Sequence, residues 1–127
     1  MPEITVVLPG SIRSKKNSKR PVRIGGKNVP SRTVILPSKA YTRWEREAQA
    51  WAWESAIVPP LVCPLEVCAT VYYSGPAPDL SGALESVGDC LEGIVWADDG
   101  QIESWDGSRR VHDLRNPRTV VVVRWEE

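Results

Sequence analysis

The chain has 127 residues, a length that suits one domain built around a single hydrophobic core. Its hydrophobic fraction of 42% excludes a disordered chain, and no apolar run approaches the roughly 20 residues of a membrane span. Sixteen basic and sixteen acidic residues give a formal net charge of zero. The N-terminus lacks the pattern of a signal peptide, so we expect a cytoplasmic protein without a membrane partner.

The two signs of charge are separated along the chain. Residues 1–44 hold ten Lys or Arg against Glu3 alone, whereas residues 79–106 hold eight carboxylates and no Lys or Arg. Clustered carboxylates repel one another unless a cation lies among them, and divalent metal ions commonly fill that role. A basic segment combined with such a cluster is typical of a protein that holds a polyanion against a metal site. The charge pattern therefore favours a nuclease.

The N-terminal third predicts a strand, a basic loop and a helix. Residues 4–8 are a β-branched strand closed by Pro9-Gly10, and residues 11–31 form a basic flexible loop or a loose hairpin. Residues 33–36 could form a second short strand. Ser38 is a good N-cap for a helix over residues 39–56. Within that helix Trp44, Ala48, Trp51 and Ser55 share one side, for which we predict core packing, with base stacking as the alternative.

The middle of the chain predicts a strand and a second helix. Residues 65–73 alternate as a long strand, and Asp79 stands at the entrance of a helix over residues 80–92. An apolar stripe recurs at helical spacing: Leu80, Leu84, Val87, Leu91 and Ile94. Glu85, Asp89 and Glu92 fall together on the opposite side of that helix, and like charges at this spacing oppose helix formation.

After Gly93 the chain predicts two more strands, over residues 102–105 and 119–125, separated by a turn at residues 106–110. This order predicts an α+β fold, in which one small domain over residues 1–127 has a mixed β-sheet packed by two main helices. Cys63, Cys68 and Cys90 lack metal-binding spacing, so we expect structural, reduced thiols.

Residues 79–99 read D-L-S-G-A-L-E-S-V-G-D-C-L-E-G-I-V-W-A-D-D. This stretch resembles the central motif of the RusA-type Holliday junction resolvases, D-x-D-N-x-x-K-x-x-x-D-x-L followed by a short turn and D-D. The opening L-P-G-S-I-R-S-K-K-N-S-K-R resembles the family's first strand and its Pro/Ser/Lys/Asn loop. A third similarity is P-S-K-A-Y before a Trp-rich helix, so the resemblance covers nearly the whole chain.

The resemblance implies a small homodimer that binds four-way DNA junctions and cuts symmetric phosphodiester bonds. It implies Mg²⁺ as the cofactor, with Mn²⁺ as a plausible substitute, and no small-molecule cofactor. On the matching positions Asp79 is the first metal ligand and Asp99 the other principal ligand, with Asp98 beside it. Asp89 matches the acidic residue on the central helix. Such a protein would act in the cytoplasm of a bacterium or of a phage-infected cell.

Three positions depart from the family pattern. The second Asp is Ser81, the following Asn is Gly82, and the Lys near the scissile phosphate is Glu85. We hypothesise that Glu85 restores the carboxylate lost at Ser81, as a metal ligand and catalytic residue. The missing cation would then come from the basic loop, from Lys16 or its neighbour Lys15. Glu92, Glu103 and Asp106 are interpreted as solvated carboxylates.

The basic residues are candidates for DNA contact through phosphates, which supply affinity without reading sequence. The predicted DNA-binding residues are Lys15, Lys16, Asn17, Lys19, Arg20, Arg109 and Arg110. Two alternatives to junction cleavage stay open. The departures at Ser81 and Glu85 are compatible with a DNA-binding protein that does not cut, and the sequence does not separate junctions from flaps or forks as substrates.

Overall fold

A mixed five-stranded sheet organises the chain in the computed structural model, which describes residues 1–14 and 19–126. The strand order is β1-β7-β4-β5, and β6 also pairs with β4. β1 (Glu3–Pro9) and β4 (Leu65–Tyr73) are antiparallel to β7 (Arg118–Arg124), whereas β5 (Ile102–Ser104) and β6 (Arg109–His112) are parallel to β4. The predicted α+β class with a mixed sheet is confirmed.

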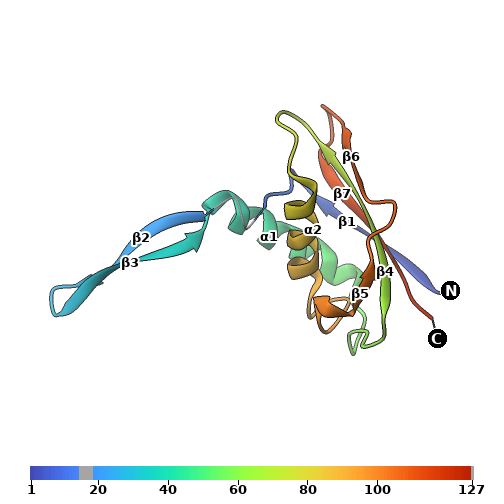
Figure 1. Cartoon of the computed structure of the whole chain (residues 1–127), viewed down its shortest axis with the longest axis horizontal. Coiled ribbons are helices and arrows are strands. Elements are labelled where there is room, and N and C mark those ends of the chain that lie inside the picture. The colour runs from blue at the N-terminus through green and yellow to red at the C-terminus, as the bar shows by residue number, and fades with distance from the viewer. Residues whose placement is uncertain (15–18, 127) are drawn as a thin grey trace.

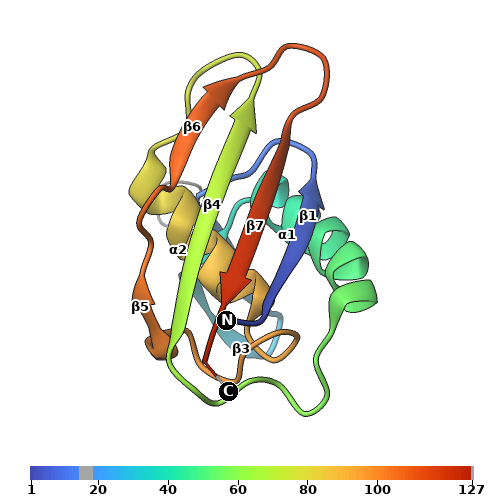
Figure 2. The ribbon, with the colours of Figure 1, turned by 90° about the vertical axis from the view of Figure 1, so that its right-hand side faces the viewer.

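One face of the sheet is packed by two helices, α1 (Lys39–Ala52) and α2 (Leu80–Leu91), which lie behind the strands in Figure 2. The alternation of β4 explains which face is buried, because Leu65, Val67, Ala69 and Val71 all point into the core. Val121 and Val123 of β7 join them. No helix within residues 1–14 and 19–126 is long and apolar enough to cross a membrane.

Helix α1 begins where the sequence predicts, because the Ser38 hydroxyl oxygen accepts the Tyr41 N–H at 3.1 Å. Its end differs slightly, since the last turn is the 3₁₀ helix η1 (Trp53–Ser55). The predicted core packing holds for Trp44 and is wrong for Trp51, which is 57% exposed. The buried side is set by Ala48 and Ala52, and Trp51 lies about 100° away from Ala52 around the helix, so it turns to solvent.

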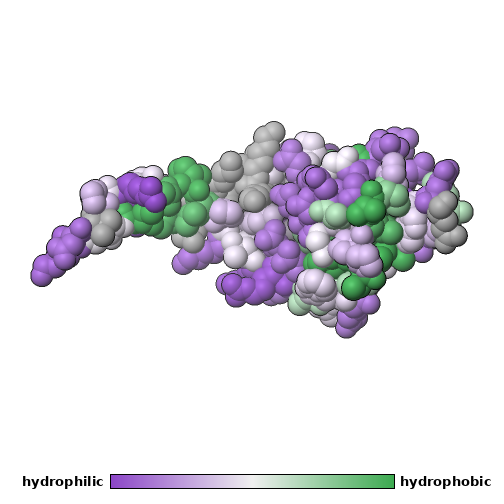
Figure 3. Space-filling view, turned by 90° about the horizontal axis from the view of Figure 1, so that it is seen from below, coloured by the Kyte–Doolittle hydropathy of each residue, from purple (hydrophilic) through white to green (hydrophobic). Residues whose placement is uncertain are grey.

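The basic segment forms an arm rather than a loop. β2 (Lys19–Gly26) and β3 (Val29–Pro37) pair antiparallel as a separate two-stranded ribbon, so the hairpin alternative is correct for the residues described. The strand predicted at residues 33–36 therefore belongs to this ribbon and not to the main sheet. The arm projects from the body (Figure 1), and hydrophobic residues gather on part of it (Figure 3). Its exposed apolar residues are Ile24, Ile35 and Leu36.

The C-terminal segment contains one strand more than the sequence predicts. The expected turn at residues 106–110 is shorter, because Arg109 already pairs with Thr70 of β4 and opens β6. Gly107 has a φ of 85° within the turn, and Ser108 accepts the Ala69 N–H with its hydroxyl oxygen at 2.9 Å. The turn is thus fastened to β4, and the next residues extend along that strand.

The three cysteines are free thiols, as expected. Cys90 is buried on α2, and burial raises its thiol pKa to about 12. Glu45 and Asp89 raise the pKa further because their negative charges disfavour a thiolate. At neutral pH Cys90 is therefore a packing residue without nucleophilic character.

Candidate metal centre

The turn after α2 brings an acidic pair back beside the helix. Gly93 has a φ of 83°, which reverses the chain, and Ile94, Val95 and Trp96 are buried directly after it. The indole N–H of Trp96 donates to the Gly88 carbonyl on α2 at 3.3 Å. Because this contact holds Trp96 against α2, the residues that follow it, Asp98 and Asp99, are carried to the side of the helix.

Gln101 fastens the acidic pair from the other side. Its side-chain amide N–H group donates to the Leu61 and Cys63 carbonyls, each at 2.9 Å, and its oxygen accepts the Asp98 N–H at 2.8 Å. Asp98 in turn caps η2 (Asp99–Gln101) by accepting the Gly100 N–H at 2.8 Å. These bonds tie the acidic turn to the loop before β4, so its backbone is held at both ends.

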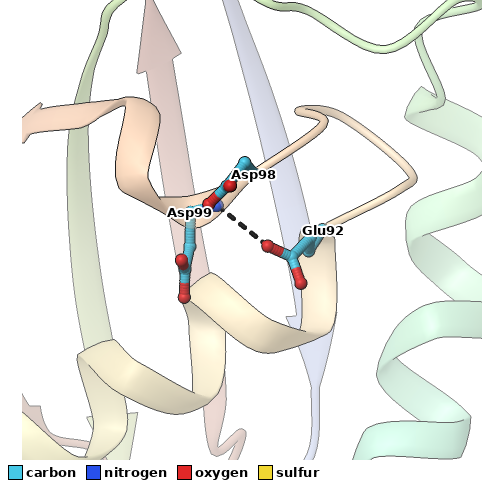
Figure 4. Close-up of side chains that lie close together, drawn as sticks. All are labelled: Glu92, Asp98 and Asp99. Carbon is cyan, nitrogen blue, oxygen red and sulfur yellow. Dashed lines mark hydrogen bonds between the residues drawn. The ribbon is translucent and has the colours of Figure 1, made fainter.

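Three carboxylates meet at this turn (Figure 4). One oxygen each of Glu92, Asp98 and Asp99 lies within 4.8 Å of the others, and all three residues are exposed. The Glu92 carboxylate accepts the Asp99 N–H at 3.0 Å. The sequence interpretation treated Glu92 as a solvated carboxylate and missed this contact. The helix-ending Gly93 directly after Glu92 is the signal that could have indicated it.

Electrostatic repulsion centres on Asp99. Partial burial raises the pKa of its carboxyl group, and the negative charges of Glu92, Asp89 and Asp98 raise it further. Desolvation is the larger cause, and the neighbouring negative charges add to it. A bound cation would therefore reduce the repulsion between Asp99 and the neighbouring carboxylates.

Asp99 also faces the side of α2. A hollow of about 290 Å³ lies there, and it is lined by Ser81, Leu84, Glu85, Gly88, Asp99, Ile102 and Trp105. A Cβ atom at Gly88 would lie 3.5 Å from the Asp99 Cβ, so the helix backbone comes into contact distance of this aspartate. The structure thus brings Glu85, Ser81 and Asp99 to one hollow.

Asp79 lies at the first turn of the same helix. It is the N-cap of α2, and its Oδ2 accepts the Ser81 hydroxyl at 3.2 Å instead of a backbone N–H. Asp79 lines a second hollow, and Ser81, which donates to Asp79, lines the hollow that contains Asp99. Asp89 is half-buried, and its charge raises the pKa of Tyr41 on α1 as well as that of Asp99. It therefore lies between α1 and the acidic turn.

The predicted DNA-binding residues fall into three groups. Lys15, Lys16 and Asn17 lie outside the described residues, and Lys19 and Arg20 open β2 of the arm. Arg109 and Arg110 are exposed on β6. The Arg110 guanidinium donates to the Pro78 carbonyl at 2.9 Å, so this residue braces the loop that presents Asp79.

The repulsion at Asp99 predicts a pH-dependent effect on stability. Because the fold raises the pKa of Asp99, its contribution to stability is present below the unfolded value of about 4 and is lost as the pH rises through the folded value. We therefore expect Asp99→Asn to raise the Tm at pH 7 in EDTA and to have little effect near pH 3. Thermal unfolding measures this, with Glu103→Gln, an exposed carboxylate outside the cluster, as the control. A lower Tm for Asp99→Asn at pH 7 would contradict the electrostatic account.

A comparison with known protein families agrees with this geometry. The family model described as endodeoxyribonuclease RusA matches residues 9–124, which include the acidic turn, α2 and the arm. A search of curated proteins found no match. The match covers nearly the entire chain and contains every described residue of the candidate metal centre. The chain belongs to the RusA endodeoxyribonuclease family.

Proposed function

We propose that this protein is a Mg²⁺-dependent endonuclease that resolves four-way DNA junctions as a homodimer. Family membership supports nuclease chemistry on branched DNA. The observation that carries the proposal for this chain is the position of Asp99. This residue shares an acidic turn with Glu92 and Asp98 and a hollow with Ser81 and Glu85. A single cation bound at Asp99 would therefore lie next to both groups.

The donor atoms suit magnesium. Mg²⁺ prefers oxygen ligands and usually keeps several waters, so two or three carboxylates are sufficient. The ligands we propose are Asp99 and Asp98 on the acidic turn and Asp79 and Glu85 on α2, with Glu92 as an additional candidate. Mn²⁺ has the same ligand preference and is expected to substitute. The raised pKa of Asp99 fits this proposal, because a cation would offset the repulsion that raises it.

The protein's own groups would position the ion and the substrate. A bound ion lowers the pKa of a metal-bound water and neutralises charge on the phosphate during hydrolysis. The Trp96 and Gln101 hydrogen bonds hold the Asp99 backbone against α2, so an ion bound by Asp99 would be held at a defined place beside the helix. Arg110 holds the loop before Asp79 in the same way. This pre-organisation avoids rearrangement when the DNA binds.

The departure at Ser81 is compatible with activity in this arrangement. The Ser81 hydroxyl donates to Asp79, so it orients that carboxylate although it carries no charge itself. Glu85 lines the same hollow as Ser81 and Asp99, which supports the hypothesis that it supplies the lost carboxylate from the next turn. Glu85 is exposed and therefore accessible to an ion. We propose it as a ligand and not as a replacement for the missing cation.

The proposal includes a homodimer and contacts to DNA phosphates. A four-way junction is two-fold symmetric, so paired cuts require two sites related by the same symmetry. A two-stranded ribbon is marginally stable by itself in water, and the arm exposes Ile24, Ile35 and Leu36. We propose that a second copy or bound DNA covers this arm. The basic residues at its start, Lys19 and Arg20, would then contribute to phosphate binding.

Cleavage of a labelled four-way junction tests the proposed function. We expect paired nicks with Mg²⁺, no nicks in EDTA, and no comparable cutting of a linear duplex. Asp99→Asn should lower the rate by at least about 100-fold while junction binding is retained, because a ligand is lost but the basic residues remain. Glu103→Gln removes an equal charge on β5 outside the acidic turn and should cut like the wild type.

The alternative function is a junction-binding protein without nuclease activity, and the residues that favour it are Ser81 and Glu85. Tight and Mg²⁺-independent junction binding by the wild type, with no nicks at any ion concentration, would establish that alternative. Equal cleavage of junctions and flaps would leave the nuclease in place and contradict the substrate preference.

Gln101 gives a further prediction, because it touches no proposed ligand oxygen and acts only by holding the acidic turn. Gln101→Leu should raise the Mg²⁺ concentration for half-maximal cleavage by about 10- to 100-fold, the usual effect of losing an outer partner of a metal ligand. Gln49→Leu is the matched control, since Gln49 donates one hydrogen bond to the Cys90 carbonyl on α2 at 3.3 Å and does not bond the backbone of residues 98–101. Equal Mg²⁺ dependence of both variants would contradict the role of Gln101.

A further inference from the structure

A second hollow, of about 270 Å³, opens beside Asp79, between the segment that follows β1 and the loop that precedes α2. The side chains that line it include Ser11, Arg13, Ser14, Tyr73, Ser74 and Asp79. It therefore combines one guanidinium group and several hydroxyl groups with a single carboxylate. Such a lining suits an anion whose oxygens accept hydrogen bonds.

Two contacts fix Arg13 at this hollow. The Ser86 hydroxyl of α2 donates to the Arg13 carbonyl at 2.6 Å, which holds the backbone of the segment on the helix. One turn earlier, Ser14 packs against Gly82 so closely that a Cβ atom at Gly82 would lie 2.5 Å from the Ser14 Oγ. Any larger residue at position 82 would require Ser14 to shift.

This close approach matches the departures from the family pattern. The pattern has Asn at position 82 and Lys at position 85, where this chain has Gly82 and Glu85. With Gly82, the segment 11–14 lies directly on α2 and brings Arg13 to the Asp79 hollow. The chain that lacks the lysine on the helix thus has an arginine beside the same helix turn.

The Arg13 guanidinium is available for a ligand. Arg13 is exposed, and the ion pairs among the described side chains join Arg118 to Asp113 and Arg124 to Glu3, neither of which involves Arg13. Arg110, the nearby cation on β6, already donates to the Pro78 carbonyl. Arg13 is therefore the better-placed cation for a phosphate bound beside Asp79.

We propose that this hollow binds a DNA backbone phosphate next to the bond that is cut, and that Arg13 supplies the cation that the family pattern places at residue 85. The inference rests on the proposed nuclease function. A guanidinium group suits this role because it offers paired donors to phosphate oxygens and stays charged at every working pH. The hydroxyl groups of Ser11, Tyr73 and Ser74, which also line the hollow, are further candidate donors.

Arg13→Gln tests the proposal in the full-length protein, with Arg124→Gln as the matched control. In the β4–β7 ladder Arg124 lies opposite Glu66, at the far end of β4 and roughly 20 Å from Tyr73 by strand length. We expect Arg13→Gln to lower kcat/KM for junction cleavage about 10- to 100-fold and to reduce the salt dependence of junction binding by about one counterion, with Arg13→Lys intermediate. Arg124→Gln should change both by less than about 3-fold. Equal effects of the two Gln variants would overturn the proposal.

A second experiment asks whether Arg13 replaces the missing lysine. The variant Ser81→Asp/Glu85→Lys restores the family pattern at both positions. In that background Arg13→Gln should lower kcat/KM for junction cleavage by less than about 3-fold. If Arg13→Gln lowers kcat/KM as much in that background as in the wild type, Arg13 does not replace the missing lysine. An inactive Ser81→Asp/Glu85→Lys variant would contradict the replacement as well. If the wild type does not cut any junction, the proposed function fails first. If the wild type cuts and Arg13→Gln matches the control, only this inference fails.

Discussion

The hydrogen bond from the Trp96 indole to the Gly88 carbonyl is the contact on which the candidate site depends. Trp96 is fully buried and is the largest such side chain among the described residues. Burial of this residue fixes the path of the chain after α2, and Asp98 and Asp99 follow it directly. The acidic pair is thus positioned by core packing and not by any attraction among the carboxylates, which repel one another.

This arrangement sets stability against function. Partial burial and the neighbouring carboxylates raise the pKa of Asp99, which makes the fold less stable at neutral pH, and the hydrogen bonds of Gln101 hold the acidic turn in place nevertheless. Exposure of Glu92, Asp98 and Asp99 reduces that destabilisation and leaves the cluster open to an ion and a DNA strand.

The features predictable from the sequence are those set by local pattern. The apolar stripe of α2 and the N-cap position of Asp79 follow from helix periodicity and from the residues next to it. The prediction that Trp51 packs in the core is wrong. The buried side of α1 is set by tertiary packing, which places Ala52 inward and leaves Trp51 exposed. The sequence does not distinguish a loop from a hairpin in the arm. Its two strands pair with each other and not with the main sheet, so no core-facing pattern marks them.

The candidate site was predictable only where a local sequence motif marks its residues. The family resemblance indicated Asp79 and Asp99, and Glu85 was a hypothesis drawn from its departure from the pattern. The structure places Asp79 in one hollow and Glu85 with Asp99 in another. Gln101 carries no such signal, because its partners Leu61 and Cys63 lie 40 and 38 residues away in the sequence. The position of Arg13 was likewise hidden, since it depends on the absence of a side chain at Gly82.

The central claim is that Asp99 holds a divalent ion, and anomalous diffraction from crystals of the protein grown with Mn²⁺ tests it most directly. The account predicts an anomalous peak about 2.1 Å from an Asp99 carboxylate oxygen, with other ligands drawn from the acidic turn and α2. Crystals that bind Mn²⁺ elsewhere, or not at all, while Asp99 remains without metal would contradict the account.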